Sequence, residues 1–209
     1  MWPTLPPDIP PPMQTNSHQA NSHQTDSHQT EPLPYEARLD ARPKAQVDLV
    51  VIHCTELPDL ATAREYGERV LYAGSGTGNS GHYYIDRDGS VHRWVDPAYV
   101  ANHTRGYNPR AIGIELVNTG RYPHWLDAGH QAMDEPYTEA QLVALTRLLQ
   151  SLAREFPTLT FIAGHEDLDT TEVAATDDPT RQVRRKRDPG PLFPWDRVLR
   201  DVALQRLVP

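Results

Sequence analysis

The chain has 209 residues, of which 38% are hydrophobic, so it can build one sizeable core but has little material for a second full domain. Its formal net charge of −8 argues against a nucleic-acid partner, because phosphate binding needs a basic face. Cys54 is the only cysteine, which excludes an intramolecular disulfide.

The sequence shows no membrane or export signal. No segment approaches the roughly 20 apolar residues that span a bilayer. The first residues also lack the basic and apolar regions of a signal peptide. We therefore expect a cytoplasmic protein, with the cell envelope as the alternative location. We also expect it to be a monomer.

Residues 1–43 hold nearly half of the twenty prolines and little apolar surface to offset the entropy of ordering. We predict that they form a disordered tail, followed by one folded domain over residues 44–209. Within the tail, three near-identical five-residue repeats each carry one histidine, at residues 16–20, 21–25 and 26–30. Histidines five apart in a flexible chain have no fixed geometry, which favours a linker over a metal site.

Apolar and β-branched runs predict buried strands at residues 47–55, 111–118 and 160–163. Residues 82–95 alternate on both sides of an Asp-Arg-Asp-Gly sequence centred on residues 86–89. Because Asp-Gly supplies the positive φ angles of a tight turn, this pattern predicts a β-hairpin.

Helices are predicted at residues 62–72, 138–156 and 195–207, the second from apolar side chains that recur at three- and four-residue spacing. The second helix begins with a capping box of Thr138 and Gln141. Together with the strands, these helices predict an α/β fold: a central mixed β-sheet flanked by helices.

Three connecting segments are predicted to be loops. Residues 74–78 are rich in glycine but lack the ending of a phosphate-binding loop. Residues 120–136 mix aromatic and polar side chains, and residues 166–187 form a long charged excursion that a solvated loop explains most simply.

Four polar residues stand in or just after the predicted strands or before a Pro-Gly-Pro stop: His53, Glu115, His165 and Asp188. Residues so placed can converge at one end of a sheet, and two imidazoles with one carboxylate are a familiar set for catalytic zinc. The spacing alone leaves open that His53 is only a hydrogen-bonded core histidine. Cys54 is expected to face away from His53, because successive strand side chains point to opposite faces.

Six motifs occur in the order found in type-2 zinc N-acetylmuramoyl-L-alanine amidases of the AmpD/AmiD-like kind, whose fold is shared with peptidoglycan recognition proteins and T7 lysozyme. The resemblance covers about residues 45–200 and rests on Val51-Ile52-His53-Cys54-Thr55, Gly81-His82-Tyr83-Tyr84-Ile85-Asp86-Arg87-Asp88-Gly89, His103-Thr104-Arg105-Gly106-Tyr107-Asn108, Ile112-Gly113-Ile114-Glu115-Leu116-Val117-Asn118, Gly164-His165-Glu166-Asp167 and Lys186-Arg187-Asp188-Pro189-Gly190-Pro191.

The resemblance implies that His53, His165 and Asp188 hold one Zn²⁺ ion. It implies hydrolysis of the amide between N-acetylmuramic acid and L-alanine, in peptidoglycan or in (anhydro)muropeptides. Glu115 matches the general base of the AmpD/AmiD branch, and a glutamate in a buried strand should have a raised pKa. Lys186 lies two residues before Asp188 and is expected to stabilise the oxyanion.

The resemblance also suggests roles for three residues around this centre. His103 and Asn108 resemble substrate-facing loop residues, and His82 is expected to support the site from behind or to be structural. Gly81 stands where the T7-like branch has a tyrosine, which favours a mechanism based on Glu115.

One departure and two other functions stay open. The interval from His165 to Asp188 is longer than expected, so Asp167 and Asp169 are alternative ligands. The first alternative function is a non-catalytic peptidoglycan-binding module of the same fold, which the complete ligand set argues against. The second is a zinc hydrolase that acts on a different amide. Recycling of muropeptides in the cytoplasm and cell-wall degradation in the envelope are both compatible with the sequence.

Overall fold

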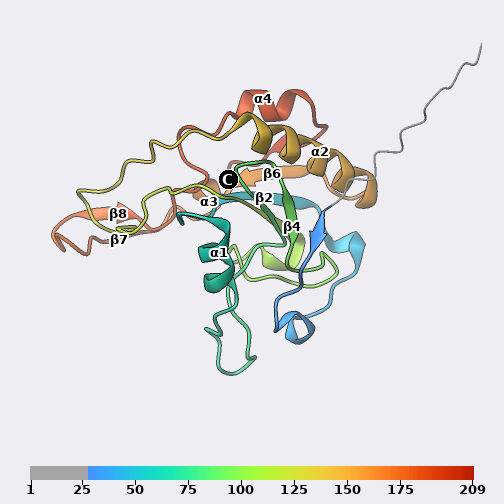
Figure 1. The fold of residues 1–209 in the computed structure, drawn as a ribbon, viewed down its shortest axis with the longest axis horizontal. Coiled ribbons are helices and arrows are strands. Elements are labelled where there is room, and N and C mark those ends of the chain that lie inside the picture. Colours follow the sequence, from blue (N-terminus) through green and yellow to red (C-terminus); the bar gives the residue numbers. More distant parts are fainter. Residues whose placement is uncertain (1–27) are drawn as a thin grey trace, which may run out of the picture.

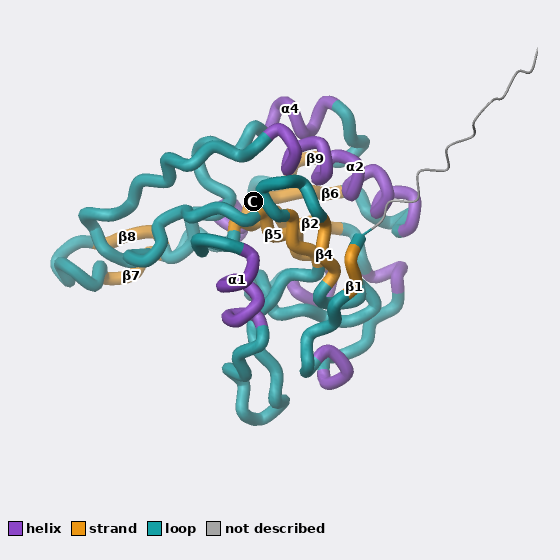
Figure 2. The backbone as a smooth tube through the Cα atoms, viewed as in Figure 1, coloured by secondary structure: helices purple, strands orange, loops and turns teal. Residues whose placement is uncertain are grey.

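The computed structural model describes residues 28–209, so residues 1–27, which hold the first two repeats and part of the third, lie outside the described residues. Within the described residues, seven strands form one mixed sheet in the order β1-β4-β3-β5-β2-β6-β9 (Figures 1 and 2). The strands are β1 (Gln29–Thr30), β2 (Leu49–Cys54), β3 (Tyr83–Ile85), β4 (Val91–Arg93), β5 (Ala111–Leu116), β6 (Phe161–Gly164) and β9 (Gln205–Arg206). The predicted central mixed sheet is confirmed.

The middle of this sheet is made by β2, β5 and β6, which run parallel to one another. All six residues of β2 are buried. Its side chains alternate between two faces, so that Val50 and Ile52 join the core beneath α2 while Val51 and His53 point to the other face. The continuous apolar run that predicted this strand therefore reflects a sheet covered on both sides.

Helices α2 (Glu139–Glu155) and α4 (Trp195–Arg200) lie together on one side of the sheet, and α1 (Leu60–Gly67) lies on the other (Figure 1). The predicted capping box of α2 is present: the Thr138 hydroxyl accepts from the Gln141 amide at 3.1 Å, and the Gln141 side chain accepts from the Thr138 amide at 3.1 Å. Leu145 and Leu149 of this helix are fully buried against the sheet.

The predicted hairpin is confirmed as the antiparallel pair β3–β4. Its turn is closed by a hydrogen bond from the Asp86 amide to the Ser90 carbonyl at 3.0 Å, and Gly89 takes the positive φ of 85°. The hairpin adds β3 to β5 in parallel, which places Tyr84 beside Glu115.

The structure differs from the predicted tail boundary at residue 43. Leu33, Tyr35 and Leu39 are buried in a cluster with Trp94, and the Tyr35 hydroxyl donates to the Gly67 carbonyl at 2.7 Å. Short 3-10 turns at Glu36–Arg38 and Lys44–Gln46 carry the chain into β2. The high proline content led to a prediction of disorder for this segment. The segment is ordered because it packs on an existing core, which needs less apolar surface than folding alone.

Two predicted helices are shorter than expected. Helix α1 ends at Gly67, and the chain then turns back so that Leu71 and Tyr72 pair with Thr77. Helix α4 ends at Arg200, and β9 follows as an edge strand whose Gln205 amide donates to the Thr160 carbonyl. Strand β9 thus satisfies carbonyl groups at the edge of β6 that a longer helix would leave unpaired.

The charged excursion at residues 166–187 is more ordered than a solvated loop. It begins with α3 (His165–Leu168) and continues as a hairpin of β7 (Glu172–Ala174) and β8 (Gln182–Arg184), which projects from the body in Figure 2. The hairpin packs on loop 120–136 through a small cluster of Ala128, Ala175 and Val183. As predicted, this loop contains no helix or strand. None of the helices in residues 28–209 is long and apolar enough to cross a membrane.

Candidate metal centre and active-site cleft

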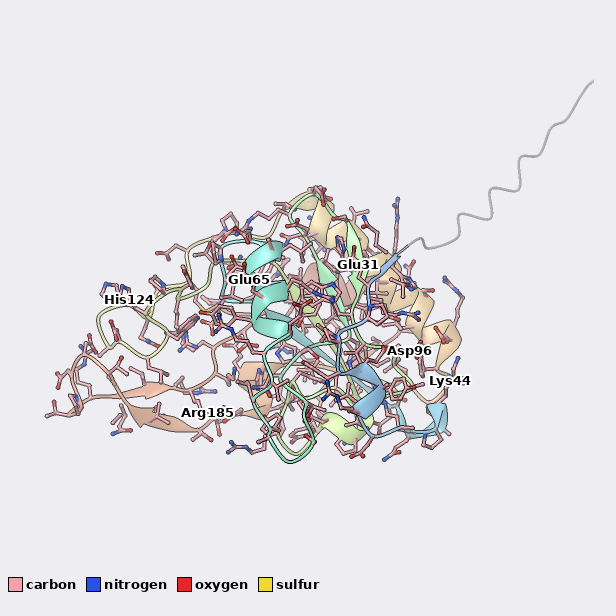
Figure 3. The ribbon with its side chains drawn as sticks, turned by 60° about the horizontal axis from the view of Figure 1, so that its bottom comes forward. Glu31, Lys44, Glu65, Asp96, His124 and Arg185 are labelled. Carbon is pink, nitrogen blue, oxygen red and sulfur yellow. The ribbon has the colours of Figure 1, made fainter. Side chains whose placement is uncertain are left out.

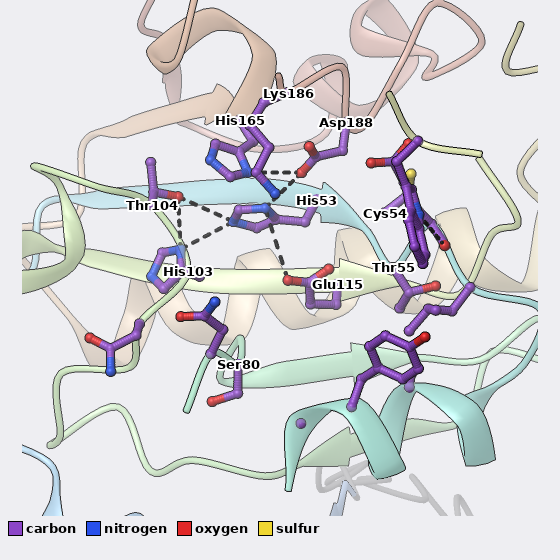
Figure 4. A pocket seen from close by; sticks show the side chains of 18 of the residues that line it. His53, Cys54, Thr55, Ser80, His103, Thr104, Glu115, His165, Lys186 and Asp188 are labelled. Carbon is purple, nitrogen blue, oxygen red and sulfur yellow. Dashed lines mark hydrogen bonds and ion pairs between the residues drawn. The ribbon is translucent and has the colours of Figure 1, made fainter. Parts of the chain in front are cut away.

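An open cleft with a volume of about 800 Å³ lies over the carboxyl ends of β2 and β5. This volume is in the range of small-molecule sites. His53 and Glu115 are paired in register on these two strands, and His165 is the first residue after β6. The predicted convergence of strand-end residues is therefore present, because the parallel strands end at the same edge of the sheet (Figure 4).

Asp188 lines the cleft and contacts both histidines through its carboxylate (Figure 4). Its Oδ2 atom is 2.8 Å from Nδ1 of His53 and 3.0 Å from Nδ1 of His165. All three side chains are buried, with at most 3% of each residue exposed. His53 is thus one member of a group and not an isolated core histidine.

The donor set of this group fits a metal ion. The possible ligand atoms of His53, His165 and Asp188 lie within 4.8 Å of one another. Asp188 Oδ1 and His165 Nε2 are buried without a hydrogen-bond partner within the described residues. Two imidazoles and one carboxylate are a common set for catalytic zinc, with a fourth position left open.

Electrostatics favour the ligand forms of these side chains. Burial lowers the pKa of His53 to about 4, so its imidazole is neutral at pH 7. Burial alone would raise the pKa of Asp188, but His165 and His53 together hold it well below its usual range. A neutral imidazole and an ionised carboxylate are the forms that bind metals.

The alternative ligands are engaged elsewhere. Asp167 accepts a hydrogen bond from the Gly164 amide at 3.0 Å and pairs with Arg206, while Asp169 pairs with Arg185. Cys54 is buried in the core on the face of the sheet opposite His53, as predicted. The long interval before Asp188 is taken up by α3 and the β7–β8 hairpin, which return the chain to the histidines.

Glu115 stands beside this centre. Its Oε1 atom is 3.9 Å from His53 Nδ1, and its side chain is 14% exposed. Burial, followed by the charge of Asp188, raises the pKa of Glu115 well above its usual value. A carboxyl group whose pKa is raised holds its proton more readily than an exposed one, which is the property of a group that accepts and returns a proton during a reaction.

Gly81 makes room for Glu115. A Cβ atom at residue 81 would lie 2.8 Å from Cγ of Glu115, which is closer than side-chain carbons normally approach. The Gly81 amide donates to the Tyr84 hydroxyl at 3.0 Å, which holds the segment against the sheet. A large side chain at residue 81 and the observed position of Glu115 therefore exclude each other.

Lys186 lines the same cleft, and its side chain points toward His53 and Asp188 in Figure 4. Its positive charge is one of the influences that lower the pKa values of His53 and Asp188. Sequence spacing placed Lys186 and Asp188 on one side of an extended segment, and both line the cleft.

His103 and Asn108 lie in the cleft wall, but both are engaged within the protein. His103 Nδ1 is 3.1 Å from His53 Nε2 and 3.0 Å from the Thr104 hydroxyl. The Asn108 side-chain oxygen accepts from the amides of His103 and Thr104 at 3.1 and 2.6 Å. Asn108 thus shapes the turn that presents His103 to the far side of the His53 ring.

Thr104 is a site residue that sequence reasoning missed. Its hydroxyl is 3.3 Å from His53 Nε2, the ring nitrogen that faces away from Asp188. A metal-binding histidine usually donates its other N–H to such a partner, which fixes its orientation. The sequence feature that could have indicated Thr104 is its position directly after His103 in the third motif.

His82 lies one layer behind the cleft and is completely buried. Its Nδ1 accepts from the Gly113 amide at 3.0 Å, and its Nε2 is 3.1 Å from the Tyr99 carbonyl and 3.0 Å from Arg42. Burial, with the charge of Arg42, lowers the pKa of His82 to about 3. These contacts join His82 to the backbone of β5 at Gly113 and to the backbone at Tyr99.

A buried ion pair lines part of the cleft. Arg121 donates to both carboxylate oxygens of Glu56 at 2.6 and 2.9 Å, and to the carbonyl groups of Arg184 and Arg185. Glu56 follows β2 with a positive φ of 49°. No spacing in the sequence joins these residues, because they come from the segment after β2, from loop 120–136 and from the end of β8.

The chain is similar to known enzymes in sequence. The family model described as N-acetylmuramoyl-L-alanine amidase matches residues 43–191. The endolysin of Escherichia phage T7 is 27% identical over 135 residues, covering 62% of this chain and 82% of that protein. The 1,6-anhydro-N-acetylmuramyl-L-alanine amidase AmpD of Haemophilus influenzae is 29% identical over 133 residues, covering 59% of this chain and 58% of that protein.

The fold is likewise that of a known enzyme structure. The N-acetylmuramoyl-L-alanine amidase LysC from Clostridium intestinale superposes with a TM-score of 0.60 at 20% sequence identity. The match covers 86% of this chain and 99% of that protein. At 20% sequence identity, this likeness shows only that the two proteins share the arrangement of sheet and helices.

Proposed function

Since this chain belongs to the N-acetylmuramoyl-L-alanine amidase family and is an enzyme of that activity, we propose that it works with one Zn²⁺ ion held by His53, His165 and Asp188. The observation that carries this proposal is the convergence of the three buried donors on one point beside Glu115. A zinc ion bound there would supply a nucleophilic water at neutral pH and polarise the amide carbonyl.

Glu115 is the proposed proton carrier. Its raised pKa suits it to take a proton from the attacking water and to give it to the nitrogen of the leaving L-alanine. Lys186, which points into the cleft, is proposed to stabilise the negative charge that develops on the carbonyl oxygen. His103 and Thr104 hold the His53 ring, and His82 supports the strand behind it.

The proposed substrate is peptidoglycan or a muropeptide, cut between N-acetylmuramic acid and L-alanine. Purified protein is incubated with anhydro-muropeptide and with intact sacculi, with and without a chelator, and mass spectrometry detects the free stem peptide that begins with L-alanine. We expect chelator-sensitive release from at least one substrate. Intact substrates in the presence of bound zinc would contradict the proposal.

Glu115→Gln tests the proton carrier. The amide is nearly isosteric but cannot accept the proton, so we expect kcat to fall by at least about 100-fold. The zinc content, measured by mass spectrometry of the metal, should stay at the wild-type value. Normal turnover in the Glu115→Gln variant would remove Glu115 from this role.

A non-catalytic binding module of this fold is not favoured, because the ligand set and Glu115 are both complete. The monomeric state and the cytoplasmic location stay predictions. Light scattering on the purified protein and fractionation of the producing cells test them separately.

A further inference from the structure

Two histidines and two aspartates outside the cleft converge where loop 120–136 meets the β7–β8 hairpin. Nδ1 of His124 is 3.2 Å from Oδ2 of Asp127, and Nδ1 of His130 is 3.6 Å from the same oxygen. The two imidazole rings are 4.7 Å apart. Figure 3 shows His124 on this loop, which lies beside the hairpin.

Backbone turns bring these three side chains together. The His124 amide donates to the Arg121 carbonyl, the Asp127 amide to the His124 carbonyl, and the His130 amide to the Asp127 carbonyl, at 2.8, 3.1 and 3.1 Å. Each of these bonds links residues three apart. In such turns, side chains at positions i and i+3 lie one above the other, so a His-x-x-Asp-x-x-His sequence forms a column on one side of the loop.

The fourth side chain comes from the turn between β7 and β8. Asp177 accepts hydrogen bonds from the amides of Ala128 and Gly129 at 2.5 and 3.0 Å, so its carboxylate is fixed against the same loop. The possible ligand atoms of Asp127, His130 and Asp177 lie within 4.8 Å of one another. Within residues 28–209, this is the second group with that property, after the cleft.

We propose that this group binds a divalent transition-metal ion through His124, Asp127, His130 and Asp177. Imidazole nitrogens with carboxylate oxygens suit Zn²⁺, Ni²⁺ and Cu²⁺. The side chains of His124 and His130 are 52% and 60% exposed, so an ion from solution can reach them. This site does not depend on the function proposed for the cleft.

The ion would join loop 120–136 to the β7–β8 hairpin. Arg121, at the start of the loop, already donates to the carbonyl groups of Arg184 and Arg185, directly before Lys186. Metal binding therefore adds a second tether between the loop and the hairpin that leads into the cleft wall. The expected effect is a more rigid hairpin.

Isothermal titration of metal-stripped protein with Zn²⁺ tests the proposal. We expect two ions per chain for the wild type and one for Asp127→Asn. Asp134→Asn is the matched control, because it removes a carboxylate of the same loop that is exposed and outside the group. It should keep two ions. His124→Gln/His130→Gln removes the imidazoles instead and should also bind one ion.

His165→Gln separates the two centres. This variant should retain one ion, and adding Asp127→Asn should remove it. If the wild type binds one ion that Asp127→Asn abolishes and His165→Gln keeps, the loop site stands while the zinc proposed for the cleft fails. One ion that only His165→Gln abolishes would overturn the loop site, as would two ions in Asp127→Asn.

Trypsin gives a readout of the tether. Arg181 is exposed in the turn of the β7–β8 hairpin and is a cleavage site there. We expect Zn²⁺ to slow cleavage after Arg181 severalfold in the wild type and in Asp134→Asn but not in Asp127→Asn. Equal protection of all three proteins would contradict the tether.

Discussion

At the scale of single residues, the geometry of the cleft depends on small side chains as much as on charged ones. Gly81 lies against Glu115, and a Cβ on Gly113 would lie 2.7 Å from the nearest atom of the His103 ring. Each glycine thus leaves room for one side chain of the cleft, Glu115 or His103. The motif sequences contain these glycines, but their reason becomes visible only when the strands are placed side by side.

Gly81→Ala is expected to displace Glu115 while leaving the fold intact. If Glu115 carries the proton as proposed, a displacement of its carboxylate by about 1 Å should lower kcat by roughly tenfold to a hundredfold. Zinc content should not change, because Gly81 does not contact the ligands. Gly74→Ala is the control, since a Cβ there meets nothing within 4 Å and its activity should be that of the wild type. Steady-state kinetics that show equal kcat for both variants would contradict the steric argument.

At the scale of elements, Glu135 connects three parts of the fold. It accepts hydrogen bonds from Arg87 in the β3–β4 turn at 2.7 and 3.1 Å, and from the Thr119 amide beyond β5 at 2.6 Å. It lies just before the start of α2. Its charge therefore holds together the hairpin, the central strand and the longest helix.

This network makes stability depend on pH. Burial would raise the pKa of Glu135, but Arg87 and Thr119 lower it below its ordinary value of 4.5. A lowered folded-state pKa means that the unfolded chain binds the proton more readily, so the stabilisation is complete above pH 4.5 and is lost as pH falls through the folded-state pKa. Glu135→Gln should cost about 1 kcal/mol at pH 7.

Chemical denaturation between pH 3 and pH 7 measures this difference. The gap in unfolding free energy between the wild type and Glu135→Gln should shrink as the pH falls below 4.5. Glu65→Gln, which alters an exposed carboxylate on α1, should show no such gap. A gap for Glu135→Gln that is constant with pH would mean that its charge does not stabilise the fold.

At the scale of the whole molecule, the sequence predicts the centre of the fold better than its margins. Strand β2 is predictable because its apolar run needs cover on both faces, and α2 because its cap and spacing agree. Strands β7 and β8 each place one valine, Val173 or Val183, in the small cluster against loop 120–136, and the charged residues around them give no local signal. The grouping of His53, His165 and Asp188 was predictable from ordered motifs. The contacts of Thr104 and Arg121 were not, because they depend on how separate parts of the chain meet.

Among the segments outside the central sheet, residues 28–43 are expected to contribute most to the stability of the fold. Tyr35 is 1% exposed, packs in the cluster with Trp94 and bonds to the Gly67 carbonyl at the end of α1. Removing such a buried aromatic side chain costs about 3–5 kcal/mol. We therefore expect Tyr35→Ala to lower the melting temperature strongly, while Tyr72→Ala, at a tyrosine that is 46% exposed, changes it little.

A pair of truncations extends this test to the whole segment. A chain that starts at residue 28 keeps the contacts of Tyr35, whereas a chain that starts at residue 44 loses them and uncovers Trp94. Calorimetry should show a clearly lower melting temperature for the shorter chain, or no cooperative transition. If both truncated chains melted at the same temperature, residues 28–43 would add nothing to the stability of the domain. The stable folding unit would then begin at residue 44, as the sequence predicts.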